Sequence, residues 1–313
     1  MGQALFQILI FPGFLFLTIL SLVFEYVDRK LYARFQNRVG PPWYQPLADI
    51  LKLLSKETVI PKDADKRLFN AIPMFAFAAT SAAFLYVPVL GTKSLLPFTG
   101  DLIVVMYFLT IPTLTFFLAG WFSSSLYAEI GAIRAMTQLF AYEVPFYMAL
   151  LGPALLAGTW SISGMAEFYN QNPWLLLVNL PGLVVSIFSA QGKLERVPFD
   201  IPDAETEIVG GTFTEYSGRL LGMFKMTLNA EMVVVAALIA AVFFPLFIFE
   251  NPVLALLVFL LKIFVIVFLL SLMKAALARF RLDQMIRFCW RFLAPISLVQ
   301  ILLDLIVKGM LLR

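Results

Sequence analysis

Apolar runs of about 20 residues recur along this chain, and no other feature limits its fold as strongly. A helix needs roughly 20 consecutive apolar residues to cross the hydrocarbon core of a bilayer. Hydrophobic residues make up 61% of the 313 residues and charged residues only 14%, whereas about a quarter of a soluble domain is charged. The sequence therefore predicts an all-α, multi-pass membrane protein surrounded by a lipid bilayer, rather than a large soluble helical protein.

We expect about eight transmembrane helices in a single integral membrane domain, residues 1–313, because no repeat or low-complexity linker divides the chain. Prolines inside several spans predict kinks whose freed carbonyl groups are satisfied by neighbouring helices. The expected spans are Ala4–Phe24, Leu68–Leu90, Asp101–Gly120, Thr137–Gly158, Pro173–Ala190, Phe224–Phe249, Pro252–Lys274 and Phe292–Leu312.

Basic residues gather in the odd-numbered loops between these spans. Nineteen of the 23 Lys and Arg residues lie in or beside these loops, with Lys193 and Arg196 among them, and the even-numbered loops contain only Lys93. Loops rich in Lys and Arg stay on the cytoplasmic side of a membrane. We therefore expect a plasma-membrane protein with cytoplasmic odd-numbered loops and two external termini.

The first of these loops also contains an amphipathic segment, which predicts a short helix at the cytoplasmic membrane surface. Its apolar face comprises Leu47, Ile50, Leu51 and Leu54, and its polar face comprises Asp49, Lys52 and Lys56.

The composition excludes much catalytic chemistry. The chain has no histidine, and its single cysteine, Cys289, lies in a basic, aromatic stretch that favours a packing role. Iron–sulfur ligation, haem or zinc ligation through histidine and a Ser–His or Cys–His nucleophile are thereby excluded. We expect no catalytic residue, cofactor or metal in this chain, and no nucleic-acid partner.

Charged side chains within or near the apolar spans are the candidate functional residues. Glu143 lies in an almost wholly apolar segment, Glu129 follows three serines, and Glu231 and Lys262 lie in spans six and seven. A charge at the centre of a membrane helix costs about 2.5–3.5 kcal/mol, so such residues face other helices or water. Burial also favours carboxyl groups that bind and release protons near neutral pH. These residues predict a path for protons or ions.

The loop after span five contains six acids interleaved with apolar residues. This alternation predicts a folded loop that packs against other parts of the protein, and a solvated charged face is the alternative. The acids are Glu195, Asp200, Asp203, Glu205, Glu207 and Glu215.

Four segments resemble, in the right order, the membrane subunit at the junction of the two arms of respiratory complex I. They span about residues 25–295 and read DRKLYARFQNRVGP with QPLADILKLLSKE, IGAIRAMTQLFAYEVP, PFDIPDAETEIVGGTFTEYSG and RFRLDQMIRFCWRFLAP. The resemblance implies eight transmembrane helices and no cofactor in this subunit. It also implies a position between a cytoplasmic redox module and antiporter-like, ion-translocating subunits.

Two sets of site residues follow from the resemblance and from the buried charges. The expected proton or ion pathway comprises Glu143, Glu205, Glu207, Glu215, Glu231, Asp203, Glu129 and Lys262. The residues expected to dock the redox module or to shape the cavity beneath it are Arg29, Arg34, Asp49, Arg134, Asp200, Arg281 and Asp283.

One departure from the complex I pattern favours a particular branch of the family. Only Pro42, Trp43 and Tyr44 separate Gly40-Pro41 from Gln45-Pro46, and this short segment borders the quinone entrance in complex I. Its shortening resembles the membrane-bound [NiFe] hydrogenases and their sulfur-reducing relatives, which oxidise ferredoxin without quinone. We expect the restricted prolines and the two bulky rings to close the quinone cavity.

That branch implies a set of partners and two alternatives. The partners are hydrophilic [NiFe] hydrogenase-like large and small subunits, antiporter-like and small membrane subunits, and ferredoxin as electron donor. Iron–sulfur clusters and a NiFe centre would lie in partner subunits. The alternatives are the quinone-binding subunit of a true complex I and a stand-alone secondary transporter. A transporter would favour inverted repeats around a midplane site, which the sequence does not display.

Overall fold

All regular structure in the computed structural model is helical across residues 2–202, 205–246 and 251–311, which the structure describes. Six helical segments in these ranges are long and apolar enough to cross a bilayer. They are Leu5–Phe35, Asp101–Trp121, Leu126–Ala157, Gly218–Phe243, Pro252–Ala276 and Leu282–Met310. The predicted all-α, multi-pass architecture is confirmed.

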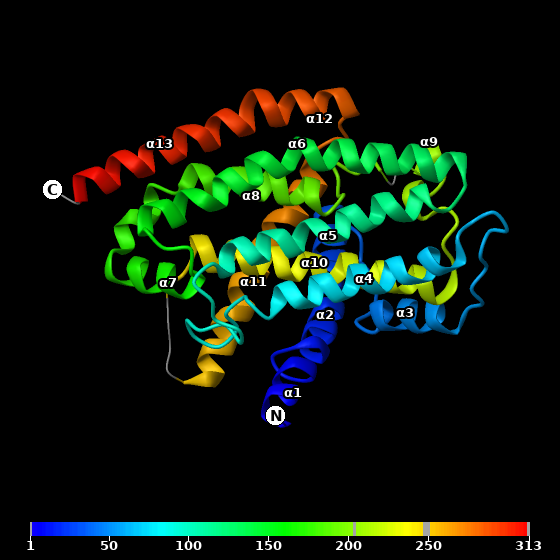
Figure 1. The fold of residues 1–313 in the computed structure, drawn as a ribbon, viewed down its shortest axis with the longest axis horizontal. Coiled ribbons are helices and arrows are strands. Elements are labelled where there is room, and N and C mark those ends of the chain that lie inside the picture. Colours follow the sequence, from blue (N-terminus) through cyan, green and yellow to red (C-terminus); the bar gives the residue numbers. More distant parts are fainter. Residues whose placement is uncertain (1, 203–204, 247–250, 312–313) are drawn as a thin grey trace.

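Most of the long helices lie side by side in one bundle (Figure 1). These are α4 (Lys66–Phe84), α5 (Asp101–Trp121), α6 (Leu126–Ala157), α8 (Leu180–Lys193), α10 (Gly218–Phe243) and α13 (Ala294–Leu311). Helix α10 is central, because it packs against α2 (Phe14–Phe35), α4, α8 and α11 (Pro252–Ala276). Helices α2 and α11 pack on each other and run at a steep angle to the bundle in Figure 1.

Short elements precede, connect or extend the long helices. They are α1 (Gly2–Leu9), α3 (Gln45–Ser55), α7 (Ile162–Gln171), η1 (Pro173–Leu177), α9 (Glu205–Ile208), η2 (Gly211–Phe213), α12 (Leu282–Phe288) and the π-helical turn η3 (Cys289–Leu293). Figure 1 places α3 and α9 at one end and α7 at the other. The basic, odd-numbered loops therefore share one end, which we call the basic end.

The first span differs from its predicted bounds at both ends. The chain breaks between α1 and α2 at Gly13, where an added Cβ would lie only 1.8 Å from the carbonyl oxygen of Ile8. Only glycine fits so close an approach of two backbone segments. Helix α2 then continues past the predicted end at Phe24 to Phe35. This extension places Glu25 and Asp28 inside a helix rather than in a loop.

Two other expected spans take shorter forms. Helix α4 has 19 residues. The span expected over 173–190 consists of the 3-10 turn η1 followed by the 14-residue α8, which rises only about 21 Å against a hydrocarbon core of about 30 Å. Pro181 lies in the first turn of α8, where a missing N–H costs no helical bond. The total of eight spans stays a prediction.

The predicted amphipathic helix is α3, and it begins directly after the short PPWY segment. Ile50 is buried against the bundle, whereas Leu51 is 56% exposed. Trp43 and Tyr44 pack edge to face and are 74% and 52% exposed. Both rings lie on the surface of this chain, and the closing of a quinone cavity by this segment stays a prediction. Amphipathic rings in that position suit a bilayer or partner interface.

The topology predicts a labelling pattern. A cysteine at exposed Lys93 should react with an impermeant maleimide on intact cells, and a cysteine at exposed Arg38 should not, because loops rich in Lys and Arg are expected on the cytoplasmic side. The native Cys289 is 1% exposed and provides a low background. Labelling at position 38 with none at position 93 would reverse the topology.

Candidate ion pathway

A fully buried ion pair lies in the interior of the bundle. Lys193 Nζ, at the end of α8, lies 3.1 Å from Glu231 Oε1 of α10, and the side chains are 2% and 0% exposed. Lys193 also donates a hydrogen bond to the carbonyl of Leu109 in α5. The prediction that Lys193 lies in a cytoplasmic loop is wrong, because α8 continues to this residue inside the bundle. The carboxylate of Glu231 thus has a cation beside it.

The ring of Tyr142 lies beside this pair, and Glu143 is the next residue on α6. Lys193 Nζ lies 5.9 Å from the ring centroid of Tyr142, whose hydroxyl is 3.1 Å from Thr113 Oγ1. On the same helix, Glu143 Oε1 accepts a hydrogen bond from Tyr147 Oη at 2.8 Å. Of the two acids selected from the sequence, Glu231 thus pairs with a buried lysine and Glu143 with a tyrosine hydroxyl.

A second buried charge cluster surrounds Asp28 of α2. Its Oδ1 lies 3.0 Å from Arg196 Nη1 and accepts a hydrogen bond of 2.6 Å from Ser271, and its Oδ2 lies 3.7 Å from Lys274 Nζ. The candidate set predicted from the sequence lacks this acid, because the first span was expected to end at Phe24. The helical period of apolar residues, which runs on to buried Ala33, is the signal that could have found it.

Five charged residues line a cleft of about 290 Å³ between α2, α3 and α10. They are Glu25, Arg29, Asp49, Lys52 and Lys225. Arg29 pairs with Glu25 and, at 2.7 Å, with Asp49. Asn229 of α10 donates a second hydrogen bond to Glu25. Partial burial alone would raise the pKa of Asp49, but hydrogen bonds from Arg29 and Gln45 lower it below the ordinary value.

A second cleft, of about 350 Å³, gathers several predicted docking residues at the basic end. It is lined by Arg134, Glu207, Arg279, Arg281 and Asp283, together with apolar residues. Arg134 Nη1 lies 2.6 Å from Glu207 Oε2, and this hydrogen bond with its charge holds the pKa of Glu207 below its ordinary value. Arg279 in turn pairs with Asp200 at 2.8 Å. The structure thus brings residues from three distant segments to one polar, accessible surface.

Other predicted site residues lie apart from these clusters. Glu129 in the first turn of α6 and Glu215 before α10 are half-buried, and Arg34 is exposed near the end of α2. Asp203 lies outside the described residues, as does the side chain of Glu205.

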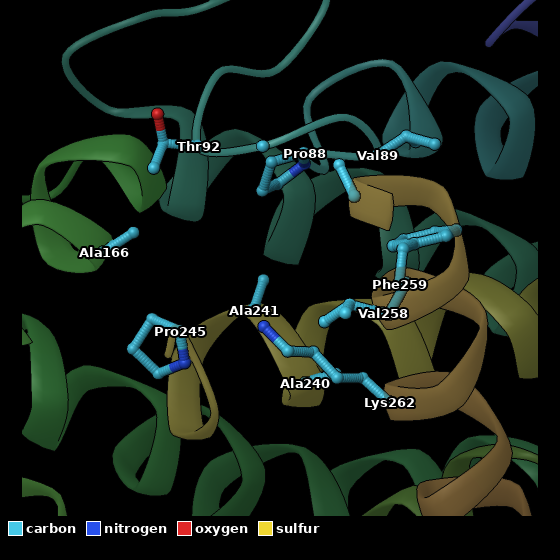
Figure 2. A pocket seen from close by; sticks show the side chains of 13 residues that line it. Pro88, Val89, Thr92, Ala166, Ala240, Ala241, Pro245, Val258, Phe259 and Lys262 are labelled. Carbon is cyan, nitrogen blue, oxygen red and sulfur yellow. The ribbon is translucent and has the colours of Figure 1, made fainter. Parts of the chain in front are cut away.

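Lys262 is also separate, because it lies in the half of α11 away from the basic end. Its Nζ donates a hydrogen bond of 2.6 Å to the carbonyl of Leu246. Figure 2 shows Lys262 beside Ala240 and Pro245 in a small cavity of about 50 Å³, which the 88–92 loop also lines. Lys262 thus lies in a different part of the protein from the acids of the predicted ion pathway.

The arrangement suits electrostatic coupling. Buried charges of opposite sign form the Lys193–Glu231 pair and the Asp28 cluster, whose Arg196 follows Lys193 by three residues, and further ion pairs line the two clefts at the basic end. In a low-dielectric interior, a change in the charge of one side chain alters how strongly neighbouring ionisable side chains favour their charged forms. Within the described part of the chain, no three His, Cys, Asp or Glu residues are grouped so as to hold a metal ion.

The relationship to known proteins agrees with this architecture. The profile of a family described as NADH dehydrogenase matches residues 7–305. The chain belongs to this family. A subunit of NADH-quinone oxidoreductase from Brevibacillus brevis is 35% identical over 301 residues, covering 90% of this chain and 87% of that protein. The corresponding subunit from Dehalococcoides mccartyi strain CBDB1 is 33% identical, covering 96% and 85%.

A solved structure is similar along almost the whole length of this NADH dehydrogenase family member. A chain of the membrane-bound sulfane sulfur reductase, described as an archaeal respiratory membrane complex, superposes with a TM-score of 0.84. The two chains are 28% identical, and the match covers 93% of this chain and 96% of the other. The predicted resemblance to the complex I junction subunit and to its sulfur-reducing relatives is confirmed.

Proposed function

We propose that this chain is the membrane-anchor and coupling subunit of a ferredoxin-linked respiratory complex in the plasma membrane. The complex is of the membrane-bound hydrogenase or sulfane/polysulfide reductase type, and the chain links its cytoplasmic redox module to translocation of H⁺ or Na⁺. One observation supports coupling above all others. A buried ion pair, Lys193–Glu231, lies three residues along the chain from Arg196, which binds Asp28 of α2, one turn beyond the Glu25 that lines a polar cleft.

The acidic loop provides the mechanical link in this proposal. Arg196 follows Lys193 by only three residues and holds Asp28 at 3.0 Å, while Glu207 in the same loop holds Arg134. A redox event above the loop changes the charge or position of these groups. The position of Lys193 relative to Glu231 then changes too, and with it the affinity of the acids for a proton.

The assignment to the ferredoxin-linked branch rests on two features. The PPWY segment is short where the quinone-reducing pattern is longer, and the sulfane sulfur reductase chain matches this one along 93% of its length. The implied partners are hydrophilic hydrogenase-like large and small subunits with iron–sulfur clusters, antiporter-like membrane subunits and small membrane subunits. The cleft of Arg134 and Arg281 is the proposed docking surface for the hydrophilic subunits.

A quinone-reducing role is the second candidate, and it also has an observation in its favour. The relatives with 35% and 33% identity are named as parts of NADH-quinone oxidoreductases. The cleft of about 290 Å³ beside α3 contains Arg29 and Asp49, polar groups that suit a quinone head group.

Purification of the complex through a tag on this chain distinguishes the ferredoxin-linked role from the quinone-reducing role. We expect hydrogenase-like subunits to co-purify, and electron transfer from reduced ferredoxin to protons or polysulfide to be insensitive to quinone-site inhibitors. The extracted lipid should contain no stoichiometric quinone. Quinone-dependent turnover, or a quinone bound in the cleft, would instead assign the chain to a true complex I.

A further inference from the structure

One buried carboxyl group lies outside all the clusters above. Asp304 of α13 is 0% exposed, and neither of its carboxylate oxygens has a hydrogen-bond partner among the described residues. No Lys or Arg in that part of the chain lies within ion-pairing distance of it; Lys308, one turn further on, donates to the carbonyl of Leu155 at 2.7 Å. An isolated carboxylate in this position is strongly disfavoured, because nothing replaces its hydration.

Asp304 lies beside a chain of hydrogen bonds that all run in one direction. Gln300 Nε2 donates to Asn179 Oδ1 at 3.2 Å, and Asn179 Nδ2 donates to Tyr169 Oη at 2.9 Å. Tyr169 donates to the carbonyl of Pro153 at 2.8 Å. Each of these donors and acceptors is used, except that Gln300 Oε1 has no donor. The chain therefore lacks one donor, at the end where Asp304 lies one helical turn from Gln300.

A protonated carboxyl group needs no counter-charge in such a site and can donate a hydrogen bond, whereas an ionised carboxylate can only accept hydrogen bonds. We propose that Asp304 is a proton-binding site on α13, packed against the backbone of α6 at Gly152. The site is distinct from the Lys193–Glu231 pair, and it lies toward the end of the bundle opposite the basic end, because Lys308, one turn further along α13, bonds to Leu155 near the end of α6 that leads to α7 (Figure 1).

Close packing around the carboxyl favours a proton over a metal cation. An added Cβ at Gly152 would lie 2.6 Å from Asp304 Oδ2, and one at Gly182 would lie 1.8 Å from Gln300 Oε1. Helices α6 and α8 thus present bare backbone to these oxygens, which leaves little room for a coordination shell. The ionisable groups near Asp304 are Tyr169 of α7 and Lys308 of α13, and both hydroxyl and ammonium already bond to carbonyls of α6.

Infrared difference spectroscopy of the purified complex tests this site. The complex should display a carboxylic-acid C=O band at neutral pH that shifts on exchange into D₂O. Asp304→Asn should lose that contribution, because the amide has the size of the acid but no titratable proton. Glu167→Gln, which changes an exposed acid at the same end, should leave the band unchanged. Gln300→Leu should shift the band, since it removes the polar side chain one helical turn before the carboxyl group.

Two results would overturn the proposal. One is an unchanged band in Asp304→Asn, and the other is a carboxylate band in the parent complex that responds to added Na⁺ and is lost in the variant. Should Asp304→Asn not assemble, the parent complex labelled with ¹³C-aspartate provides the test. The acid band must then shift with the label, and an unshifted band excludes Asp304.

Discussion

Replacing Lys193 alone with methionine should destabilise the assembled subunit by about 3–5 kcal/mol, because Glu231 would become an uncompensated charge in the interior. Both side chains are at most 2% exposed, and the pair lies among α5, α6, α8 and α10. Water cannot therefore replace the lost cation. The measurement is the thermal unfolding midpoint of the purified complex, followed together with the retention of this subunit.

The double variant Lys193→Met/Glu231→Gln separates loss of the pair from loss of packing. Removing both charges avoids the buried, unpaired carboxylate, so most of the stability should return. Arg134→Met is a comparison for the stability of this subunit alone. It breaks a pair whose acid is 56% exposed, and such pairs contribute about 0–1 kcal/mol, so the unfolding of this subunit should change little even where hydrophilic subunits dissociate. A double variant as unstable as Lys193→Met alone would contradict the importance of the ion pair.

The sequence predicted the all-helical membrane fold well because the length and spacing of apolar runs reflect bilayer thickness directly. It predicted helix ends less well, and the ends determine which charges are buried. The hydropathy pattern placed Glu25 and Asp28 after the first span, yet α2 carries them into the bundle. It placed Lys193 in a basic loop, yet this residue ends α8 with 2% exposure. Charged residues at helix ends resemble loop residues in a hydropathy pattern.

The sequence also could not show which residues of the candidate site pair with each other. Asp28 and its partner Arg196 are 168 positions apart, and no periodicity links two such residues. Glu143 and Glu231 could be selected because an acid within an apolar run is conspicuous. The lysine that pairs with Glu231 could not be selected in this way. Asp304 also lies in an apolar run, but it follows the last of the four family-like segments, so no motif distinguished it. Its isolation is visible only once α6 and α8 are packed against it.

Glu231→Gln and Glu143→Gln should slow ion translocation by about a hundredfold or more, the usual contribution of a positioned group to proton transfer. Glutamine keeps the size and hydrogen-bonding capacity of each side chain, so Tyr147 and Lys193 retain acceptors beside them. It cannot bind and release a proton at neutral pH. Glu231→Gln also removes the counter-charge of buried Lys193 and should lower stability, so pumping is measured per assembled complex. Electron transfer in the redox module should continue, at a rate no longer tied to the ion gradient.

Inside-out vesicles containing the complex provide both readouts, dye quenching for ion uptake and substrate consumption for electron transfer. Glu207→Gln is the informative comparison, because Glu207 is an exposed acid paired with Arg134 at the basic end. If the interior acids move protons and the cleft docks partners, this variant should weaken retention of the hydrophilic subunits. Pumping per electron in the complexes that remain should be normal. Normal pumping in both interior variants would instead show that Glu143 and Glu231 are structural. Equal pumping defects in Glu143→Gln, Glu231→Gln and Glu207→Gln would show that the cleft and the interior do not have separate roles.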